Sequence, residues 1–313
     1  MRVKSLTLKE WEILERAASI TTPFHDVAWF ELILSSLGGE LDQYLCEFDG
    51  QRWLVPCFSN GPWGEKSFRI GSIGYGGPVP LFDCPTPEAM VAGSLRAIRA
   101  VAQKRNQVCL AVSVFPLSTW GGLEESALCG GHCVSTSIIY ADQSPEETFG
   151  RAHGAKRTGV RKAVKLGLKA NRLNGCDARP AQELIAQTQM NVGAAYTTPL
   201  SLVQGMLEHK SAQIKGYGVM VEQKLVSVVL ALERKENAFL LFHGWDRAYA
   251  NTNANELVYW EFIRSAIENG ARQIDLGRSH SISLLKSKER WGAVETPILT
   301  FDNIHMDTVH AAI

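Results

Sequence analysis

The sequence predicts an α/β (α+β) fold of two similar units, each a mixed, mainly antiparallel sheet flanked by helices. Two observations predict this arrangement. The strand-and-turn pattern of residues 44–52 recurs at 217–224, and the helix-to-strand segment of 97–110 recurs at 262–275. Each pair is separated by about 170 residues, and two matches at nearly the same spacing favour a duplicated domain over chance.

A polar turn marks the expected boundary between the two units. Residues 142–145 read Asp-Gln-Ser-Pro, a cluster typical of a connection between elements. We therefore predict an N-terminal domain of residues 1–145 and a C-terminal domain of residues 146–313. The last residues of the chain are free to return to the first domain.

The elements of the first unit follow from local signals. A capping box at Thr7–Glu10 predicts the start of the first helix, and Asp26 precedes a second one. Asp49-Gly50 between two apolar runs predicts a β-hairpin. Residues 87–104 are predicted as a helix and residues 108–114 as a buried strand.

The second unit carries most of the polar signals. The run FLLFHGW predicts a strand at 239–245, which a polar loop follows at 246–253. A helix is predicted from Glu256 to Gly270, and the next strand ends in the sequence Asp-Leu-Gly-Arg-Ser at 275–279. Side chains at the carboxyl end of a strand are often functional in α/β proteins.

The composition indicates a soluble globular chain. Of its 313 residues, 45% are hydrophobic and 20% are charged. The 32 Lys and Arg residues balance 32 Asp and Glu residues, which excludes a wholly basic nucleic-acid coat but allows a local basic patch. No apolar run approaches the roughly 18 residues of a membrane span, and the charged start lacks the apolar centre of a signal peptide. We therefore expect a cytoplasmic protein with no integral membrane segment.

The cysteines give no metal signal that stands on its own. Cys129 and Cys133 flank His132 in CGGHC, but no second Cys or His pair lies at a matching distance. We predict no metal site and expect the seven cysteines to be reduced thiols, mostly packed as small hydrophobes.

One stretch of the neutral chain is strongly basic. Residues 151–172 hold eight Lys and Arg residues and no acid. On a helix, residues four apart share a face, so this charge suits a phosphate-bearing ligand such as a nucleotide, a coenzyme tail or an RNA backbone; the alternative is a solvated helix. The predicted donor- and phosphate-binding residues are Lys156, Arg157, Arg161, Lys162 and Lys165.

The C-terminal pattern resembles the signature of Fem-type (FemAB/FemX-like) acyltransferases of the GNAT superfamily. That signature runs Asn-x-Leu-x-Trp-x-x-Ile-x-x-Ala, then Gly, Asp-x-Gly-Arg-Ser and Lys-x-x-Trp-Gly. The matching residues are Asn255, Leu257, Trp260, Ile263, Ala266, Gly270, Asp275, Gly277, Arg278, Ser279, Lys288, Trp291 and Gly292. The segments 24–29, 74–78 and 157–167 are similar to the same family.

The resemblance implies two tandem GNAT-like domains and an acyltransferase. Its activity would be transfer of an aminoacyl or acyl group from an activated donor to an amine of a cell-envelope, exopolysaccharide or specialised-metabolite acceptor. The implied donor is aminoacyl-tRNA or an acyl thioester such as acyl-CoA, with tRNA or a carrier protein as partner and no permanently bound cofactor. The sequence leaves the oligomeric state open.

One departure from the GNAT pattern supports an alternative. The loop at 246–253 contains no glycine, whereas a coenzyme-A-binding GNAT domain has a Gly-rich loop there whose amides hold the pyrophosphate. The alternative is therefore a non-catalytic tandem-GNAT binding module for an envelope or carrier partner.

The resemblance and the strand-end positions together predict the site residues. The catalytic candidates are Lys288, Asp275 and His243: the lysine could stabilise charge on the reacting carbonyl, and either of the others could act as the base. The substrate-binding candidates are Arg278, Tyr259, Ser279 and Asn255.

Several of these candidates also have a structural interpretation. Lys288 could be a partly exposed helix lysine, which would contribute little to folding. Asp275 could form an ion pair with Arg278, and His243 could be a hydrogen-bonded core residue. If Lys288 and Arg278 are functional, the turn at Gly277 should bring them to the same pocket.

Overall fold

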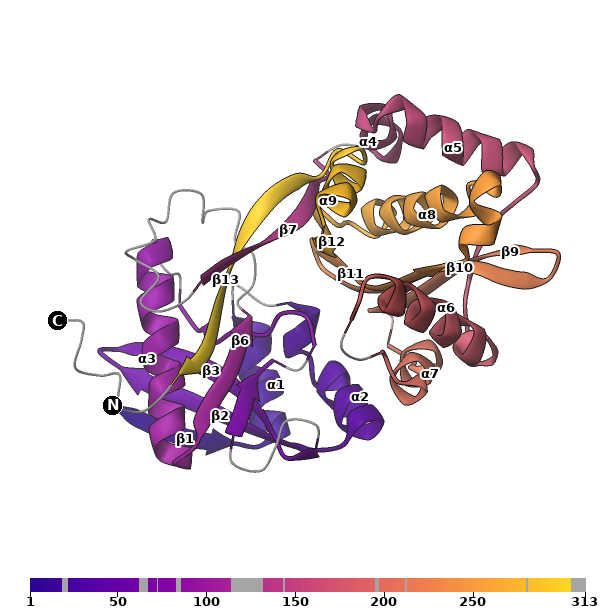
Figure 1. The fold of residues 1–313 in the computed structure, drawn as a ribbon. Coiled ribbons are helices and arrows are strands. Elements are labelled where there is room, and N and C mark those ends of the chain that lie inside the picture. Colours follow the sequence, from indigo (N-terminus) through magenta and orange to yellow (C-terminus); the bar gives the residue numbers. More distant parts are fainter. Residues whose placement is uncertain are drawn as a thin grey trace. The chain divides into compact units, whose positions relative to one another are not determined.

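The computed structural model describes residues 1–18, 22–61, 67–71, 73–82, 86–113, 132–142, 144–194, 197–211, 213–279 and 281–304. The chain forms two compact units, one of Met1–Val134 with Thr296–Ile313 and the other of Ser135–Glu295 (Figure 1). The division into folding domains at residue 145 stays a prediction.

The first unit is a mixed sheet with the strand order β1-β2-β3-β4-β6-β13, and β5 pairs with β3. Of the strands described in this unit, only β4 and β6 are parallel neighbours, and α3, which precedes β6, packs on an apolar face of the sheet. Its elements are β1 (Arg2–Leu6), α1 (Leu8–Ala17), the 3-10 helix η1 (Pro23–His25), α2 (Val27–Leu37), β2 (Glu40–Phe48), β3 (Gln51–Ser59), β4 (Ser67–Ile70), β5 (Val79–Pro80), α3 (Pro87–Arg105), β6 (Val108–Ser113) and most of β13 (Val294–Ile304).

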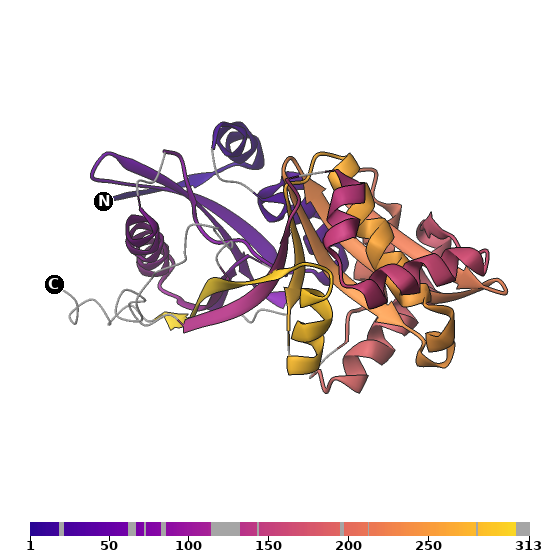
Figure 2. The same ribbon diagram turned by 90° about the horizontal axis from the view of Figure 1, so that it is seen from above.

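The second unit has the strand order β7-β12-β11-β10-β9-β8. Helix α8 connects the parallel strands β11 and β12 and packs on β9 and β10, while α6 and α7 cover the other face. Its elements are β7 (His132–Tyr140), α4 (Pro145–Arg151), α5 (Gly154–Lys165), β8 (Ala170–Arg172), η4 (Gly175–Asp177), α6 (Ala178–Asn191), α7 (Leu200–Glu208), β9 (Ile214–Val221), β10 (Lys224–Arg234), β11 (Asn237–Trp245), η5 (Arg247–Thr252), α8 (Ala254–Glu268), β12 (Gln273–Arg278) and α9 (Ile282–Glu289). Figures 1 and 2 show α5 lying on the outer side of α8.

The two sheets share one succession of strand orientations. From β1 to β13, and likewise from β8 to β7, three antiparallel pairs are followed by one parallel pair and one antiparallel pair. The predicted fold class of two mixed, mainly antiparallel sheets flanked by helices is therefore confirmed, and the shared order is what a duplicated unit requires.

The final strand of each sheet is not the next strand along the chain. β7 follows β6 in sequence but pairs with β12 in the second unit. β13, the last strand, pairs antiparallel with β6, from Thr300 opposite Ser113 to Ile304 opposite Cys109. In each sheet, the second strand of the parallel pair has an antiparallel strand on its other side. This strand is β13 beside β6 and β7 beside β12.

Local signals in the sequence produce the expected element ends. The capping box of α1 forms, with Glu10 N donating to Thr7 Oγ1 at 3.2 Å and Thr7 N donating to Glu10 Oε2 at 2.8 Å. Asp26 caps α2. The β2–β3 hairpin turns at Asp49-Gly50 with φ of 51° and 75°, the positive values that a two-residue type I′ turn requires.

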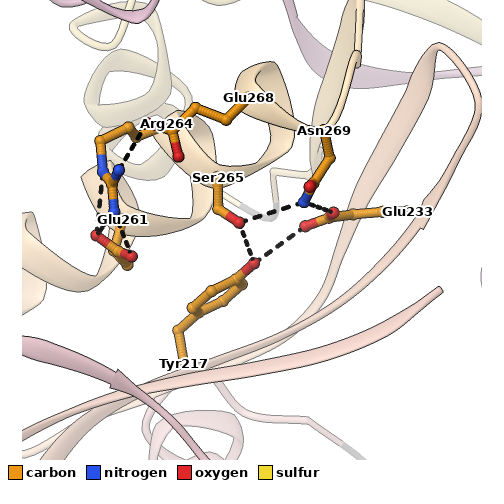
Figure 3. A network of polar contacts seen from close by, with 7 residues as sticks. All are labelled: Tyr217, Glu233, Glu261, Arg264, Ser265, Glu268 and Asn269. Atoms are coloured by element: carbon orange, nitrogen blue, oxygen red, sulfur yellow. Dashed lines mark hydrogen bonds and ion pairs between the residues drawn. The ribbon is translucent and has the colours of Figure 1, made fainter. Parts of the chain in front are cut away.

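A polar network around the buried Tyr217 and Glu233 fastens the C-terminal end of α8 to the sheet (Figure 3). The Tyr217 hydroxyl lies 2.7 Å from Ser265 Oγ and 3.2 Å from Glu233 Oε1, and Asn269 Nδ2 donates to Glu233 Oε2 at 2.9 Å. Burial, with the nearby Glu233 charge, raises the pKa of Tyr217 to about 12. Beside this network Arg264 forms ion pairs with acids on its own helix, as Figure 3 shows for Glu261.

The contact of α6 with β11 leads to a stability prediction. A Cβ at Gly244 would lie 2.5 Å from both Ile185 N and Leu184 C, which are backbone atoms that cannot rotate away. We expect Gly244→Ala to lower the free energy of unfolding by about 1–3 kcal/mol, measured by denaturant titration. The control is Gly150→Ala in α4, where a Cβ meets nothing within 4 Å and the change should stabilise slightly. Equal stability of the two variants would contradict this account.

Candidate functional site

The candidate site lies in the second unit, where two parallel strands stop pairing. β11 and β12 form a ladder only between Asn237–Phe239 and Gln273–Asp275. Directly afterwards the pairing of β11 with β10 shifts by one residue, between Leu230 and Ala231. The carboxyl ends of β11 and β12 therefore have no ladder with each other, and His243 and Gly277 lie in these ends.

Asp275 organises the end of β12. Its carboxylate is 3% exposed, and Oδ1 accepts hydrogen bonds from Thr136 Oγ1 at 2.5 Å and from Gly277 N at 2.6 Å. The ladder with β7 is irregular between Asp275 and Arg278, and Gly277 has a φ of +81°. The carboxylate thus joins β7 to a turn in its own strand. At this turn Gly277 has a left-handed conformation, which glycine adopts without strain.

Lys288, on the last turn of α9, reaches back to the same turn. Its Nζ donates to Gly277 O and to Arg278 O, each at 2.7 Å. Burial lowers the pKa of Lys288 to about 8, and the charge of Asp275 opposes this effect. An ammonium has three N–H donors, so one remains without a partner among the described residues.

The structure corrects the expected environment of Lys288. The side chain is 3% exposed, so the prediction of a partly exposed helix lysine is wrong. α9 returns across the end of β12, where two main-chain oxygens replace the water that the ammonium loses. Lys288 contacts the main-chain oxygen of Arg278; the convergence of its ammonium and the Arg278 guanidinium on one pocket stays a prediction.

His243 is held by a neighbouring amide. Its Nε2 lies 2.6 Å from Oδ1 of Asn255, in the first turn of α8, and the ring centroid lies 4.9 Å from that of Tyr259. Burial lowers the pKa of His243 to about 4; the hydrogen bond to Asn255 opposes this, while the charges of Lys288 and Lys156 favour it. The imidazole is therefore neutral at pH 7.

An aromatic stack joins this histidine to the buried lysine of α5. Tyr259 and Trp291 lie nearly parallel with centroids 6.3 Å apart, and Lys156 Nζ lies 5.3 Å from the Trp291 ring centroid. Lys156 Nζ also lies 3.1 Å from Ser287 Oγ and 3.5 Å from a Glu256 carboxylate oxygen. Burial raises the pKa of the Tyr259 phenol and lowers the pKa of Lys156.

The predicted phosphate-binding residues therefore divide into two groups. Lys156 is 9% exposed and points inward, toward α8 and α9. Arg161, Lys162 and Lys165 are exposed, and Arg157 is half-buried. Among the described residues none of these four has an ion-pair partner; Arg161 lies 5.8 Å from the ring centroid of Phe149.

Acids occupy the N-terminal ends of both η5 and α8. The segment before α8 forms the 3-10 helix η5, capped by Asp246, which accepts a hydrogen bond from Ala248 N at 3.0 Å and pairs with Lys224 at 2.8 Å. Asn253 then turns with a φ of +58°, and Glu256 occupies the first turn of α8. A carboxylate in the first turn uses the positive end of the helix dipole that a phosphate would need.

The remaining candidates lie beside the same turn. Arg278 and Ser279 are half-buried, and Ser279 Oγ has no hydrogen-bond partner in the described part of the chain. Sequence reasoning missed Thr136 and Glu256. Thr136 comes from β7, more than a hundred residues away, and no local pattern marks it. Glu256 follows Asn255 directly and could have been noted as an acid in a first helical turn.

The low pKa of Lys288 makes a testable contribution to stability. Unfolding returns its pKa from about 8 to the ordinary value of 10.5, so the unfolded chain binds more protons between these pH values. The unfolding free energy should therefore rise with pH in this window, by on the order of 3 kcal/mol from this group. Lys288→Met should remove that rise. Denaturant titrations from pH 7 to 10.5 measure it, and parallel curves for the two proteins would contradict the burial of a charged Lys288.

Over the described ranges, no group of three or more His, Cys, Asp and Glu side chains is arranged to hold a metal ion. Most of the Cys129–Cys133 segment lies outside those ranges. None of the helices in the same ranges has the length and apolar character needed to cross a membrane.

Similarity to known proteins agrees with this geometry. A family model described as an acetyltransferase (GNAT) domain matches residues 156–286. No curated protein matches the chain in sequence. The crystal structure of FemX superposes with a TM-score of 0.69 at 13% identity, over 96% of this chain and 97% of that one.

Two further solved structures resemble the whole chain. A tandem GNAT protein from the clavulanic acid biosynthesis pathway has a TM-score of 0.56 at 12% identity, over 98% of this chain and 99% of that one. The C-terminal domain of a putative lysylphosphatidylglycerol synthetase from Agrobacterium fabrum has a TM-score of 0.54 at 10% identity, over 96% and 94%. The chain therefore has the Fem-like tandem GNAT fold, and its second unit carries a GNAT acyltransferase domain.

Proposed function

We propose that this protein transfers an aminoacyl or acyl group from an activated donor to an amine, in the manner of the Fem-type enzymes that it resembles. The acceptor belongs to a cell-envelope component, an exopolysaccharide or a specialised metabolite, and the reaction takes place in the cytoplasm. The observation that carries the proposal is the buried Lys288 ammonium, which has one N–H without a partner among the described residues and whose charge acts on the neutral imidazole of His243.

The chemistry needs few groups. A neutral amine attacks the carbonyl carbon of an ester or thioester; the C–N bond forms, the C–O or C–S bond breaks, and one amine proton ends on the departing oxygen or sulfur. The negative charge that develops on the carbonyl oxygen is stabilised by the third N–H of Lys288, because a preorganised donor in a water-poor site costs no reorganisation. Asp275 acts indirectly, through the turn that accepts the lysine, and Arg278 and Ser279 contact the substrate.

We favour aminoacyl-tRNA over acyl-CoA as the donor. The first turn of α8 already holds Glu256, and a pyrophosphate there would meet this carboxylate. The outward cations of α5, which have no ion pair among the described residues, suit a phosphodiester chain, since Arg157 and Lys165 are about 12 Å apart along the helix, farther than one pyrophosphate reaches. The glycine-free loop supports the alternative, a binding module without catalysis, because that module would need no donor.

A donor screen separates the two functions. The purified chain is incubated with charged tRNA or acetyl-CoA and three amines, an amino sugar, a lysyl peptide and a polyamine, and products are detected by mass spectrometry. Transfer from charged tRNA supports the proposal. Thermal stabilisation by a ligand without any transfer from either donor would support the binding module instead.

We expect Lys288→Ala to lower the rate of transfer by about 10²-fold or more, the effect of losing one preorganised electrostatic contact. The matched control is Lys286→Ala, an exposed lysine on the same helix, which should keep the wild-type rate. Circular dichroism establishes that both variants are folded. A folded Lys288→Ala protein with full turnover would remove this residue from the mechanism.

The basic face of α5 gives a second functional prediction. Replacing Arg157, Arg161 and Lys165 with Gln should weaken binding of tRNA and reduce the slope of log K against log salt by about two to three. The control replaces the exposed lysines 210, 235 and 286 with Gln. Fluorescence anisotropy between 50 and 200 mM salt measures both quantities; an unchanged slope would identify α5 as an ordinary solvated helix.

A further inference from the structure

Asn255 and His243 form a pair whose partners come from two rigid elements. His243 projects from β11 and Asn255 from the first turn of α8. The next residue, Gly244, packs directly on the backbone of α6, so β11 has little freedom to move here. The tilted ring of Tyr259 lies against the imidazole and is itself stacked on Trp291.

The hydrogen bond determines which ring nitrogen carries the hydrogen. An amide oxygen can only accept, so the 2.6 Å contact with Asn255 Oδ1 requires Nε2 of His243 to donate. The Ser227 hydroxyl, with one hydrogen to donate, lies 3.4 Å from the same oxygen and 3.5 Å from Gly244 O. In a neutral imidazole Nδ1 then keeps a free lone pair, and it has no partner within the described residues.

Burial keeps the ring neutral. The charges of Lys288 on α9 and Lys156 on α5 act in the same direction, since both disfavour a positive charge on His243. With a pKa of about 4, the ring is a poor store for a proton taken from an amine at pH 7. It is well suited to accept a hydrogen bond and keep it.

We propose that Asn255 is a positioning residue, which holds His243 in the tautomer with hydrogen on Nε2, so that Nδ1 accepts a hydrogen bond from the amine to be acylated. This role rests on the proposed acyl transfer. The bonded N–H orients the amine so that its lone pair meets the donor carbonyl. His243 gains no proton, and the amine proton ends on the departing oxygen or sulfur as before.

The tautomer is measured directly by nitrogen NMR of the full chain labelled with ¹⁵N-histidine. His243→Gln identifies the signal of interest among the eight histidines. At pH 7 the native protein should show Nε2 protonated and Nδ1 bare. A protonated Nδ1, or a charged imidazolium at this pH, would overturn the inference.

Substitution of Asn255 tests the positioning role. Asn255→Ala should give a mixture of tautomers. Asn255→Asp places a carboxylate beside Nε2 and should move the titration midpoint of His243 from about pH 4 to between about 5 and 7. The matched control is Asn251→Ala, an exposed asparagine in η5, which should change neither signal. Native-like signals in both Asn255 variants would also overturn the inference.

The pH profile of transfer from charged tRNA links the pair to the reaction. In Asn255→Asp the acid limb of kcat should move to higher pH with the His243 titration, whereas a purely structural residue would lower kcat without moving the limb. If the native protein transfers nothing from any donor, the proposed function fails even though NMR still reports the tautomer. If transfer occurs and the acid limb does not move, only the role of Asn255 is lost.

Discussion

The site is organised around a buried ammonium group that two main-chain oxygens hold at the end of β12. Removing a charged lysine from water costs several kcal/mol, and this cost is offset only where hydrogen bonds of good geometry replace the lost water. The carbonyls of Gly277 and Arg278 supply two such bonds. Asp275 shapes the turn that presents them and also contributes a compensating negative charge. The end of the strand, the position of α9 and the charge in the site therefore depend on one another.

The cations of α5 have two different environments. Lys156 is turned inward, where Glu256, Ser287 and the Trp291 ring compensate its burial. It thereby joins α5 to α8 and α9. The neighbouring cations of the same helix stay at the surface without ion pairs among the described residues. The basic stretch therefore has two roles. Lys156 positions the helix, and the outward cations stay available to a ligand.

Helix α8 connects these features because both of its ends are fastened by polar contacts. At its N-terminal turn Asn255 binds His243 and Glu256 binds Lys156. At the other end Ser265 and Asn269 join the buried network of Tyr217 and Glu233. Its apolar face, with Val258 and Phe262 fully buried, packs on the sheet between these ends. A helix held in this way keeps the imidazole and the aromatic stack in a constant relation.

Sequence alone determined the features that arise from neighbours along the chain. The capping box at Thr7, the Asp49-Gly50 turn and the helical basic stretch follow from patterns of adjacent residues. The repeated plan of two sheets follows from matches between distant segments, and the Fem-type signature from a motif that spans residues 255–292. The tertiary structure decided what becomes of each side chain. Lys288 and Lys156 look like surface lysines in sequence, but long-range packing buries both. Thr136 reaches Asp275 from a strand 139 positions away, and β7, which follows β6 in sequence, pairs with β12. Burial and charge at a site are sums over groups brought together from distant segments, and no local pattern contains those sums.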